Sequence, residues 1–207
     1  MDFSDKADVR RQMLAARRTL SAPALARASA GVRDIAARLI RRLSPTVVAG
    51  YVPIGSEPGG PDLPRALVAA VGPGGRLLLP VLRPDLDLDW AEWAAGDPLT
   101  PAGRGLREPA GRRLGPAAVG AAGMVFVPAV AVDRRGRRLG RGGGSYDRAL
   151  ARVSPAALTV ALLHDGELLA EVPAEPHDRA VRAVIMPGTG VVWLDGEPPD
   201  DANLALG

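Results

Sequence analysis

The chain has 207 residues, of which 47% are hydrophobic and 24% charged, with a formal net charge of +3 and no cysteine. These values exclude a disulfide framework and a thiolate metal site, and they favour a single domain over residues 1–207. Aromatic residues make up only 3%, so base-stacking platforms would be scarce and a basic nucleic-acid-binding protein is disfavoured. No apolar run has transmembrane length. We therefore expect a cytoplasmic monomer without membrane or nucleic-acid partners.

Two amphipathic helices are predicted near the N-terminus, over residues 5–20 and 23–43. Lys6 and Arg10 lie four residues apart, so their side chains share one face near the start of the first helix. Lys6 is the only lysine in a chain that otherwise uses arginine for its positive charge, which favours a site that needs a compact ammonium group. A solvated surface lysine is the alternative interpretation.

Apolar runs then predict the strands of a buried sheet. The first covers residues 46–52, and the loop over 53–62 follows its carboxyl end, where open α/β sheets bind ligands. A short helix is predicted over 62–71 and a second strand over 76–82. Residues 86–93 alternate between apolar and polar, a pattern typical of an edge strand with one solvated face.

The most distinctive stretch follows a predicted buried strand over residues 124–132 and leads into a predicted helix from Arg148. Its loop is rich in glycines, which can turn successive N–H groups toward an anion: Gly140, Gly142, Gly143 and Gly144. Arg137, Arg138 and Arg141 add charge suited to phosphate oxygens. Asp147 offers the hard oxygen ligand that Mg²⁺ prefers. These features predict a phosphate site.

Two common nucleotide motifs are excluded for this loop. No Gly-Lys-Ser/Thr follows the glycines, so it is not a P-loop, and the glycine and acid offsets do not fit the dinucleotide fingerprint. A flexible surface loop decorated with arginines is the alternative interpretation.

Three further strands are predicted over residues 158–163, 181–186 and 191–194. The acidic, proline-rich tail from residue 195 is expected to be loosely ordered. The alternation of strands and helices predicts a three-layer α/β/α sandwich with a mostly parallel central sheet.

The glycine loop also carries a family signature. The segment from Pro128 to Asp147, with its pattern Asp-x-x-Gly-x-Arg-Leu-Gly-x-Gly-x-Gly-x-Tyr-Asp, resembles the nucleotide-binding signature of the 5-formyltetrahydrofolate cyclo-ligase (5,10-methenyltetrahydrofolate synthetase) family. Further matches occur in the expected order: Lys6-x-x-Val9-Arg10, Tyr51 through Glu57, Gly105-Leu-Arg-Glu108-Pro109 and Pro173-x-Glu175-x-His177-Asp178. The resemblance therefore covers most of the chain.

This resemblance implies an ATP-dependent ligase that forms a C–N bond. Its reaction would convert 5-formyltetrahydrofolate to 5,10-methenyltetrahydrofolate and release ADP and phosphate, with ATP as cosubstrate and Mg²⁺ as cofactor. ATP would phosphorylate the formyl oxygen, and N10 would then attack the activated carbon. The protein would need no covalent nucleophile, because it acts by positioning the reactants and neutralising charge.

The resemblance also implies the site residues. ATP is expected to contact the first helix through Lys6, Ala7, Asp8, Val9 and Arg10, and the loop through Arg138, Leu139, Gly140, Arg141, Gly142, Gly143, Gly144, Ser145 and Tyr146. The folate is expected to contact Arg10, Val52, Glu57, Glu108, Arg141 and Tyr146. The catalytic residues would be Lys6, Arg141 and Tyr146, and the metal ligands Asp147 and Asp178.

Two departures from the family pattern bear on activity. Gly143 stands where the family commonly has lysine, which removes a cation from the loop, and Ser145 stands where it has tyrosine, which removes an aromatic wall. Two other functions stay open on the sequence: a nucleotide-binding relative without cyclo-ligase activity and, less favoured, a basic nucleic-acid-binding protein.

Overall fold

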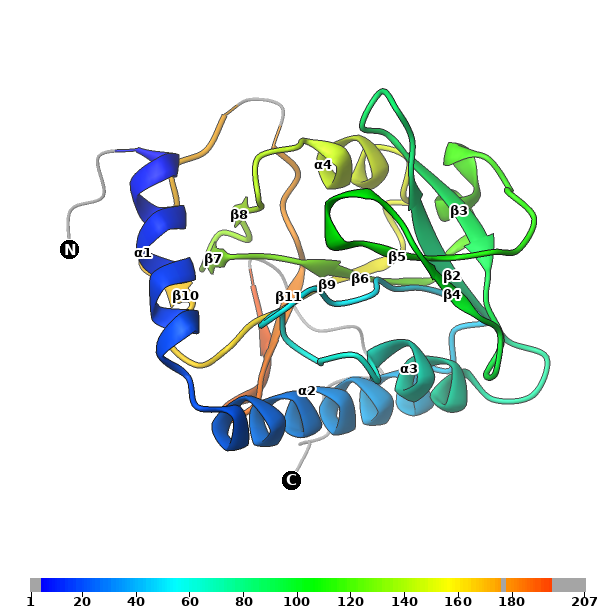
Figure 1. The fold of residues 1–207 in the computed structure, drawn as a ribbon, viewed down its shortest axis with the longest axis horizontal. Helices are drawn as coiled ribbons and strands as arrows, with labels where there is room; N and C mark the ends of the chain where they lie inside the picture. Colours follow the sequence, from blue (N-terminus) through cyan, green and yellow to red (C-terminus); the bar gives the residue numbers. More distant parts are fainter. Residues whose placement is uncertain (1–4, 176–177, 195–207) are drawn as a thin grey trace.

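The computed structural model describes residues 5–175 and 178–194; His177 and the predicted tail from residue 195 lie outside these ranges. A seven-stranded sheet in the order β12-β11-β9-β6-β1-β2-β3 forms the centre (Figure 1). Its strands are β1 (Val47–Ala49), β2 (Arg76–Leu82), β3 (Leu88–Glu92), β6 (Met124–Pro128), β9 (Leu158–Leu162), β11 (Ala183–Met186) and β12 (Gly190–Trp193). The inner strands are parallel, and the edge strands β12 and β3 run antiparallel to their neighbours.

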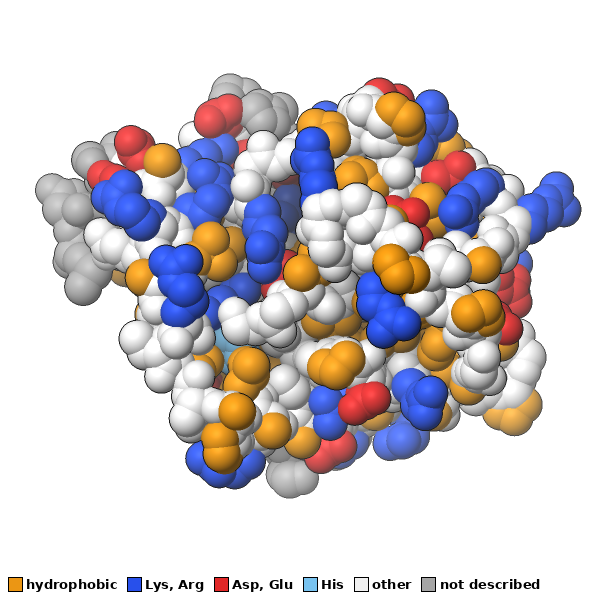
Figure 2. Space-filling view, in the orientation of Figure 1, with side chains coloured by type: hydrophobic (Ala, Val, Ile, Leu, Met, Phe, Trp, Pro, Cys, Tyr) orange, Lys and Arg blue, Asp and Glu red, His pale blue; other side chains and the backbone are white. Residues whose placement is uncertain are grey.

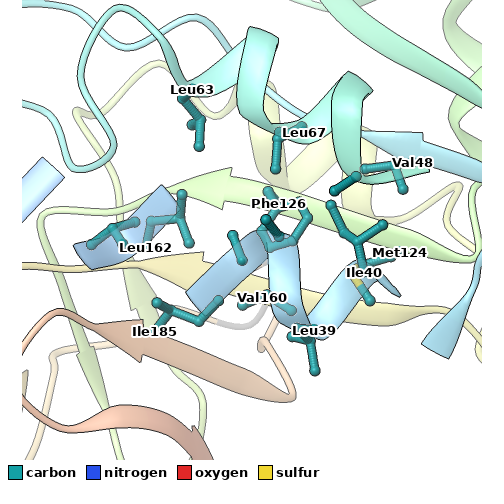
Figure 3. Close-up of a cluster of buried hydrophobic side chains, with 14 of the residues drawn as sticks. Leu39, Ile40, Val48, Leu63, Leu67, Met124, Phe126, Val160, Leu162 and Ile185 are labelled. Atoms are coloured by element: carbon teal, nitrogen blue, oxygen red, sulfur yellow. The ribbon is translucent and has the colours of Figure 1, made fainter. Parts of the chain in front are cut away.

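Two helices cover one face of this sheet: α2 (Ala22–Leu43) and α3 (Leu63–Val71). Ser21 caps the start of α2 because its Oγ accepts a hydrogen bond from the backbone N–H of Ala24. The buried side chains between these helices and the strands include Leu39, Leu67 and Phe126 (Figure 3). Burial of such large apolar groups stabilises the packing of this layer on the sheet.

The opposite face carries the 3₁₀ helix η2 (Pro116–Ala121) and the short helix α4 (Ser145–Leu150). Val125 and Val127 of β6 point to this side, whereas Met124 and Phe126 point to α2 and α3, as the alternation of a strand requires. The predicted three-layer α/β/α fold with a mostly parallel sheet is therefore confirmed. Its second helical layer consists of short segments.

The sequence prediction of one strand over residues 124–132 is wrong. β6 ends at Pro128, and the chain enters a second, three-stranded sheet of β7 (Ala131–Asp133), β8 (Arg138–Leu139) and β10 (Leu168–Leu169). The buried Asp133 carboxylate holds the β7–β8 turn, since it accepts hydrogen bonds from the backbone N–H groups of Arg135 and Arg137. The backbone has already left the main sheet before this turn, between Pro128 and Ala131.

Helix α1 (Lys6–Thr19) packs against this small sheet, and Asp5 caps its first turn. On the other side of the molecule, β4 (Leu99–Pro101) and β5 (Arg107–Pro109) form a hairpin around the 3₁₀ turn η1 (Gly103–Gly105). Among the described residues, no helix is both long enough and apolar enough to cross a membrane.

Candidate active site

A cavity of about 990 Å³ opens at the carboxyl ends of β1, β2 and β6. Its walls come from segments distant in sequence, namely the start of α1, the loop after β1, the β4–β5 hairpin, the glycine loop and the segment around residues 173–178. Figure 2 shows the surface hollowed between α1 and α4, with Lys and Arg side chains along the hollow. Parallel α/β sheets commonly bind ligands at this edge.

The glycine loop forms one wall, and its backbone requires glycine at two positions. Gly142 has φ 100° and Gly144 has φ 66°, values that residues with a Cβ rarely adopt. Helix α4 begins at Ser145, three residues earlier than the sequence predicted, so Tyr146 and Asp147 lie in its first turn. The loop is joined to α1 because Arg10 Nε donates to the carbonyl oxygen of Gly140 at 2.9 Å.

Arg138 lies beneath this loop. Its Nη2 donates to Asp147 Oδ1 at 2.9 Å, and its guanidinium carbon lies 6.0 Å from the centre of the Tyr146 ring. The Arg138 side chain is only 3% exposed. This geometry suits Arg138 to holding Asp147 and Tyr146 in place more than to contacting a phosphate directly.

A second ion pair joins α1 to the segment after β10. Lys6 Nζ lies 2.7 Å from Asp178 Oδ2 and 3.2 Å from Glu175 Oε1. Burial alone would lower the pKa of Lys6, but the hydrogen bonds and charges of these two carboxylates outweigh it and raise that pKa. The backbone N–H of Arg179 donates to Asp147 Oδ1 at 3.3 Å. Asp147 and the segment of Asp178 are thus neighbours at the same end of the cavity.

The opposite end of the cavity is organised around the buried Glu57. Its Oε2 accepts from the backbone N–H of Ile54 at 2.8 Å, and its Oε1 accepts from Arg141 Nε at 2.8 Å. Burial and the charge of Glu57 raise the pKa of Tyr146, and the same two causes raise that of Tyr51. Both phenols therefore stay protonated near neutral pH, and each can donate a hydrogen bond.

Comparisons with known proteins agree with this arrangement. A model of the 5-formyltetrahydrofolate cyclo-ligase family matches residues 2–187. The chain belongs to this family. It is 45% identical over 158 residues to a 5-formyltetrahydrofolate cyclo-ligase of Mycolicibacterium smegmatis, covering 74% of this chain and 79% of that protein. It is 39% identical over 79 residues to a mitochondrial cyclo-ligase of Arabidopsis thaliana, covering 33% and 28%.

Solved structures of methenyltetrahydrofolate synthetases have the same fold. The Aquifex aeolicus protein superposes with a TM-score of 0.72 at 26% identity, over 94% of this chain and 95% of that one. The Mycoplasma pneumoniae protein gives a TM-score of 0.68 at 18% identity, over 87% and 97%. The family and the ligase class predicted from the sequence are therefore confirmed.

For this cyclo-ligase family member, nearly all predicted site residues line the one cavity. The exceptions are Asp8 and Val9. Val9 is fully buried against Leu139 and Val172, and Asp8 forms an ion pair with Arg11. Successive helix residues are rotated by about 100°, so the face that carries Lys6 and Arg10 cannot also present these two side chains. The structure therefore does not place these two side chains in the cavity wall, and a contact of either residue with ATP stays a prediction.

The sequence analysis missed other residues that line the cavity. They come from the loop after β1, the β2–β3 hairpin, the β4–β5 hairpin and the segment before residue 175: Ile54, Pro80, Leu82, Leu88, Arg104, Leu106, Arg107, Pro173 and Ala174. Glu108, which was predicted, lines the cavity and also accepts a hydrogen bond from the backbone N–H of Leu82 at 2.9 Å. Leu106 and Arg107 lie within or beside matched motifs, which is the signal that could have found them.

The two predicted metal ligands fit Mg²⁺ in part. Within the described ranges, no group of three or more His, Cys, Asp or Glu residues could hold a metal. Asp147 and Asp178 would supply two carboxylates, which fits the usual manner in which Mg²⁺ is bound through one or two carboxylates, substrate phosphates and water. In a site of this kind, phosphate oxygens of a nucleotide and water molecules supply the remaining metal ligands.

At Gly143, one of the two departures from the family pattern, the loop leaves open space for a side chain. A Cβ built on Gly143 would meet only Ser145 Oγ, at 3.5 Å. Arg148 Nη2 donates to the Gly143 carbonyl oxygen at 3.2 Å and to that of Leu86 at 2.6 Å, so it fixes the loop from outside. Within the described chain, Arg10 is the cation nearest to Gly142, at 3.7 Å from a Cβ placed there.

Proposed function

We propose that this protein is an ATP- and Mg²⁺-dependent 5-formyltetrahydrofolate cyclo-ligase that releases ADP and phosphate as it forms 5,10-methenyltetrahydrofolate. The observation that carries the proposal is the single cavity of about 990 Å³ that joins the glycine loop to the Glu57 loop. A cavity of this volume is at the upper end of the roughly 300–1,000 Å³ typical of small-molecule sites. Two substrates could therefore meet in it.

At the nucleotide end, Lys6, Arg10 and the backbone N–H groups of the glycine loop would bind the ATP phosphates. Asp147 and Asp178 would hold Mg²⁺, which when bound neutralises charge on the transferring phosphate. In the structure both carboxylates are paired with cations. Binding of ATP with its metal would therefore exchange these partners, with Lys6 moving from a carboxylate to a phosphate oxygen.

At the folate end, Glu57 and Tyr146 would orient the pterin ring. Glu57 presents acceptor oxygens and Tyr146 a protonated hydroxyl, so the two groups complement the donors and acceptors of a pterin edge. Val52 and Leu106 add apolar wall. Glu108 lies across the cavity on the β4–β5 hairpin, where it can accept hydrogen bonds from the rest of the folate.

The reaction would occur where the two ends meet. The formyl oxygen attacks the γ-phosphorus of ATP and ADP leaves. N10 then attacks the formyl carbon and loses its proton, and the C–O bond breaks to release phosphate and leave the methenyl bridge. Arg141 lies at this boundary, since it belongs to the glycine loop and pairs with Glu57. It is therefore placed to stabilise charge that develops on the formyl oxygen and the phosphate.

The test is turnover of the purified protein, followed by the absorbance of the methenyl product and by phosphate release. Product is expected only when 5-formyltetrahydrofolate, ATP and Mg²⁺ are all present, with one phosphate per folate. Full rates in EDTA or without nucleotide would contradict the proposal. Binding of ATP without turnover would instead favour a nucleotide-binding relative, and DNA affinity that falls steeply with salt would favour a nucleic-acid-binding protein. We also propose a cytoplasmic monomer, which fractionation and light scattering would test.

A further inference from the structure

A network of buried polar side chains lies behind the cavity wall. Arg17 of α1 and Glu167 are both buried and form a two-point ion pair, with Nε–Oε1 at 2.6 Å and Nη2–Oε2 at 2.8 Å. Arg17 Nη2 also donates to the carbonyl oxygen of Ala129 at 2.6 Å, and Ala129 lines the cavity. The end of α1 opposite Lys6 is thus fixed to the cavity wall.

His164 connects this network to the Glu57 loop. Its backbone N–H donates to Glu167 Oε2 at 2.8 Å, and its Nε2 lies 2.8 Å from the carbonyl oxygen of Ser56. A carbonyl oxygen only accepts hydrogen bonds, so Nε2 must carry the proton. The imidazole is buried, and its Nδ1 has no hydrogen-bond partner in the part of the chain that the structure describes. Within residues 5–175 and 178–194, the hydrogen bond to Ser56 is therefore the only one made by this side chain, and the orientation of the ring depends on it.

The loop that His164 contacts is also held by other hydrogen bonds. Ile54 N–H donates to Glu57 Oε2, and Arg33 Nη1 donates to the Gly59 carbonyl oxygen, but neither bond involves Ser56. The backbone N–H of Glu57 donates to the Ile54 carbonyl oxygen at 3.1 Å and closes a turn, in which Gly55 has φ 57°. Ser56 is central in that turn, so its carbonyl oxygen must find a partner outside the turn. Tyr51 Oη holds the far side of the loop by donating to the Pro58 carbonyl oxygen at 2.9 Å.

We propose that His164 is a positioning residue for the folate site, because its Nε2–H fixes the turn that orients the Glu57 carboxylate. The inference rests on the proposed role of Glu57 in binding the pterin. Without the Nε2–H donor, the partly buried Ser56 carbonyl oxygen would lack a hydrogen bond. The turn would then shift until this oxygen meets another donor. Glu57 would move with the turn, whereas the glycine loop and Lys6 would keep their positions.

The experiment compares three substitutions by KM for each substrate. His164→Gln places an amide N–H near the position of Nε2 and keeps the donor, whereas His164→Asn is polar but too short to reach Ser56, and His164→Leu has no donor. We expect the Asn and Leu variants to raise the folate KM about tenfold, the effect of losing one hydrogen bond to a partly buried group. The ATP KM should change less than about twofold, and the Gln variant should stay within about threefold of the parent.

A double-mutant cycle with Glu57→Gln separates this proposal from the proposed function. If His164 acts through Glu57, His164→Asn should add little to the folate KM of a Glu57→Gln protein. Full additivity, or an equal rise in both KM values, would show that His164 only stabilises the fold and would overturn the inference. A Glu57→Gln protein with an unchanged folate KM would instead contradict the proposed role of Glu57. Should His164→Leu fail to fold, the Gln and Asn pair still decides the outcome.

Discussion

Two regions of this molecule contain ion pairs with similar nitrogen–oxygen distances but different accessibility to water. Behind the cavity, the Arg17 and Glu167 side chains are 2% and 7% exposed, so water and ligands reach neither partner. Inside the cavity, Arg141 is 50% exposed although its partner Glu57 is 6% exposed, and Lys6 is 22% exposed beside Asp178. In these two cavity pairs the cation is the more accessible partner, whereas in the Arg138–Asp147 pair of the same cavity it is the less accessible one, at 3% against 16%.

The difference indicates what each region can do. A pair whose cation faces an open cavity can exchange its carboxylate for a phosphate, because the new partner can approach and replace the lost charge. A sealed pair has no such replacement, and breaking it leaves a buried charge whose desolvation is costly. We therefore expect breaking the Arg17–Glu167 pair to change mainly stability, and breaking a pair inside the cavity to change mainly activity.

Breaking the sealed pair should have the largest effect. Glu167→Gln would leave the Arg17 guanidinium buried without a counter-charge and should lower the free energy of unfolding by about 3–5 kcal/mol. Urea denaturation followed by circular dichroism measures this change. The double substitution Arg17→Met with Glu167→Leu is the control, and it should recover part of the loss. A change below about 1 kcal/mol would remove the contrast between the two regions.

Asp147→Asn should affect activity more than stability. The amide oxygen can still accept from Arg138, but it lacks the charge that would hold Mg²⁺, so we expect kcat/KM to fall at least about 100-fold. The loss of stability should be smaller than in Glu167→Gln, since the Asp147 side chain is 16% exposed and more accessible to water. Steady-state kinetics and urea denaturation of the same preparation compare the two effects. Activity within a few-fold of the parent would show that Asp147 only anchors Arg138.

Lys6→Ala tests a more exposed pair. If Lys6 contacts ATP, the apparent KM for ATP should rise about tenfold with little change in melting temperature, because the pair is partly solvated. Lys6→Arg should recover only part of this loss, since a planar guanidinium does not replace a compact ammonium. Arg11→Ala is a matched control on the same helix, as its side chain is 68% exposed and pairs with Asp8. Equal ATP KM values in all four proteins would exclude α1 from the nucleotide site.

Features with a local signal could be predicted from the sequence. Continuous apolar runs predicted the buried strands of the sheet, and the glycine spacing indicated the loop that forms one cavity wall. The order of strands and helices predicted the layers, because parallel strands need helical crossovers on their faces.

Features that depend on distant contacts could not be predicted. The apolar run over residues 124–132 gave no sign that the chain leaves the sheet after Pro128, since β6 and β7 are equally apolar and β7 is buried by packing on α1. Val9 matched a motif, but its orientation follows from the position of the small sheet. The network of Arg17, Glu167 and His164 joins residues up to 150 positions apart, and no sequence pattern marks such pairs.

The smallest predicted effect concerns a further ion pair, which lies outside the cavity. Arg152 donates to both carboxylate oxygens of Asp87, at 2.9 and 2.6 Å, and ties the segment after α4 to the β2–β3 turn. The hydrogen bonds from Arg152 hold the pKa of Asp87 below its ordinary value. Since the folded pKa is lower than the unfolded one, the stabilisation is fully present above the ordinary aspartate pKa of about 3.9 and is lost as pH falls through the folded value.

Both side chains of this pair retain contact with water, at 34% and 12% exposure, so the contribution should be less than about 1 kcal/mol. The measurement is urea denaturation of the parent and of Asp87→Asn at about pH 6 and again near pH 3. The difference in unfolding free energy between the two proteins should shrink at the lower pH, because acid protonates Asp87 in the parent and abolishes the charge that the variant already lacks. A difference that is the same at both pH values would mean that Arg152 holds the turn by hydrogen bonding alone. Solvent access would then not be sufficient to rank the ion pairs of this protein by their energetic contribution.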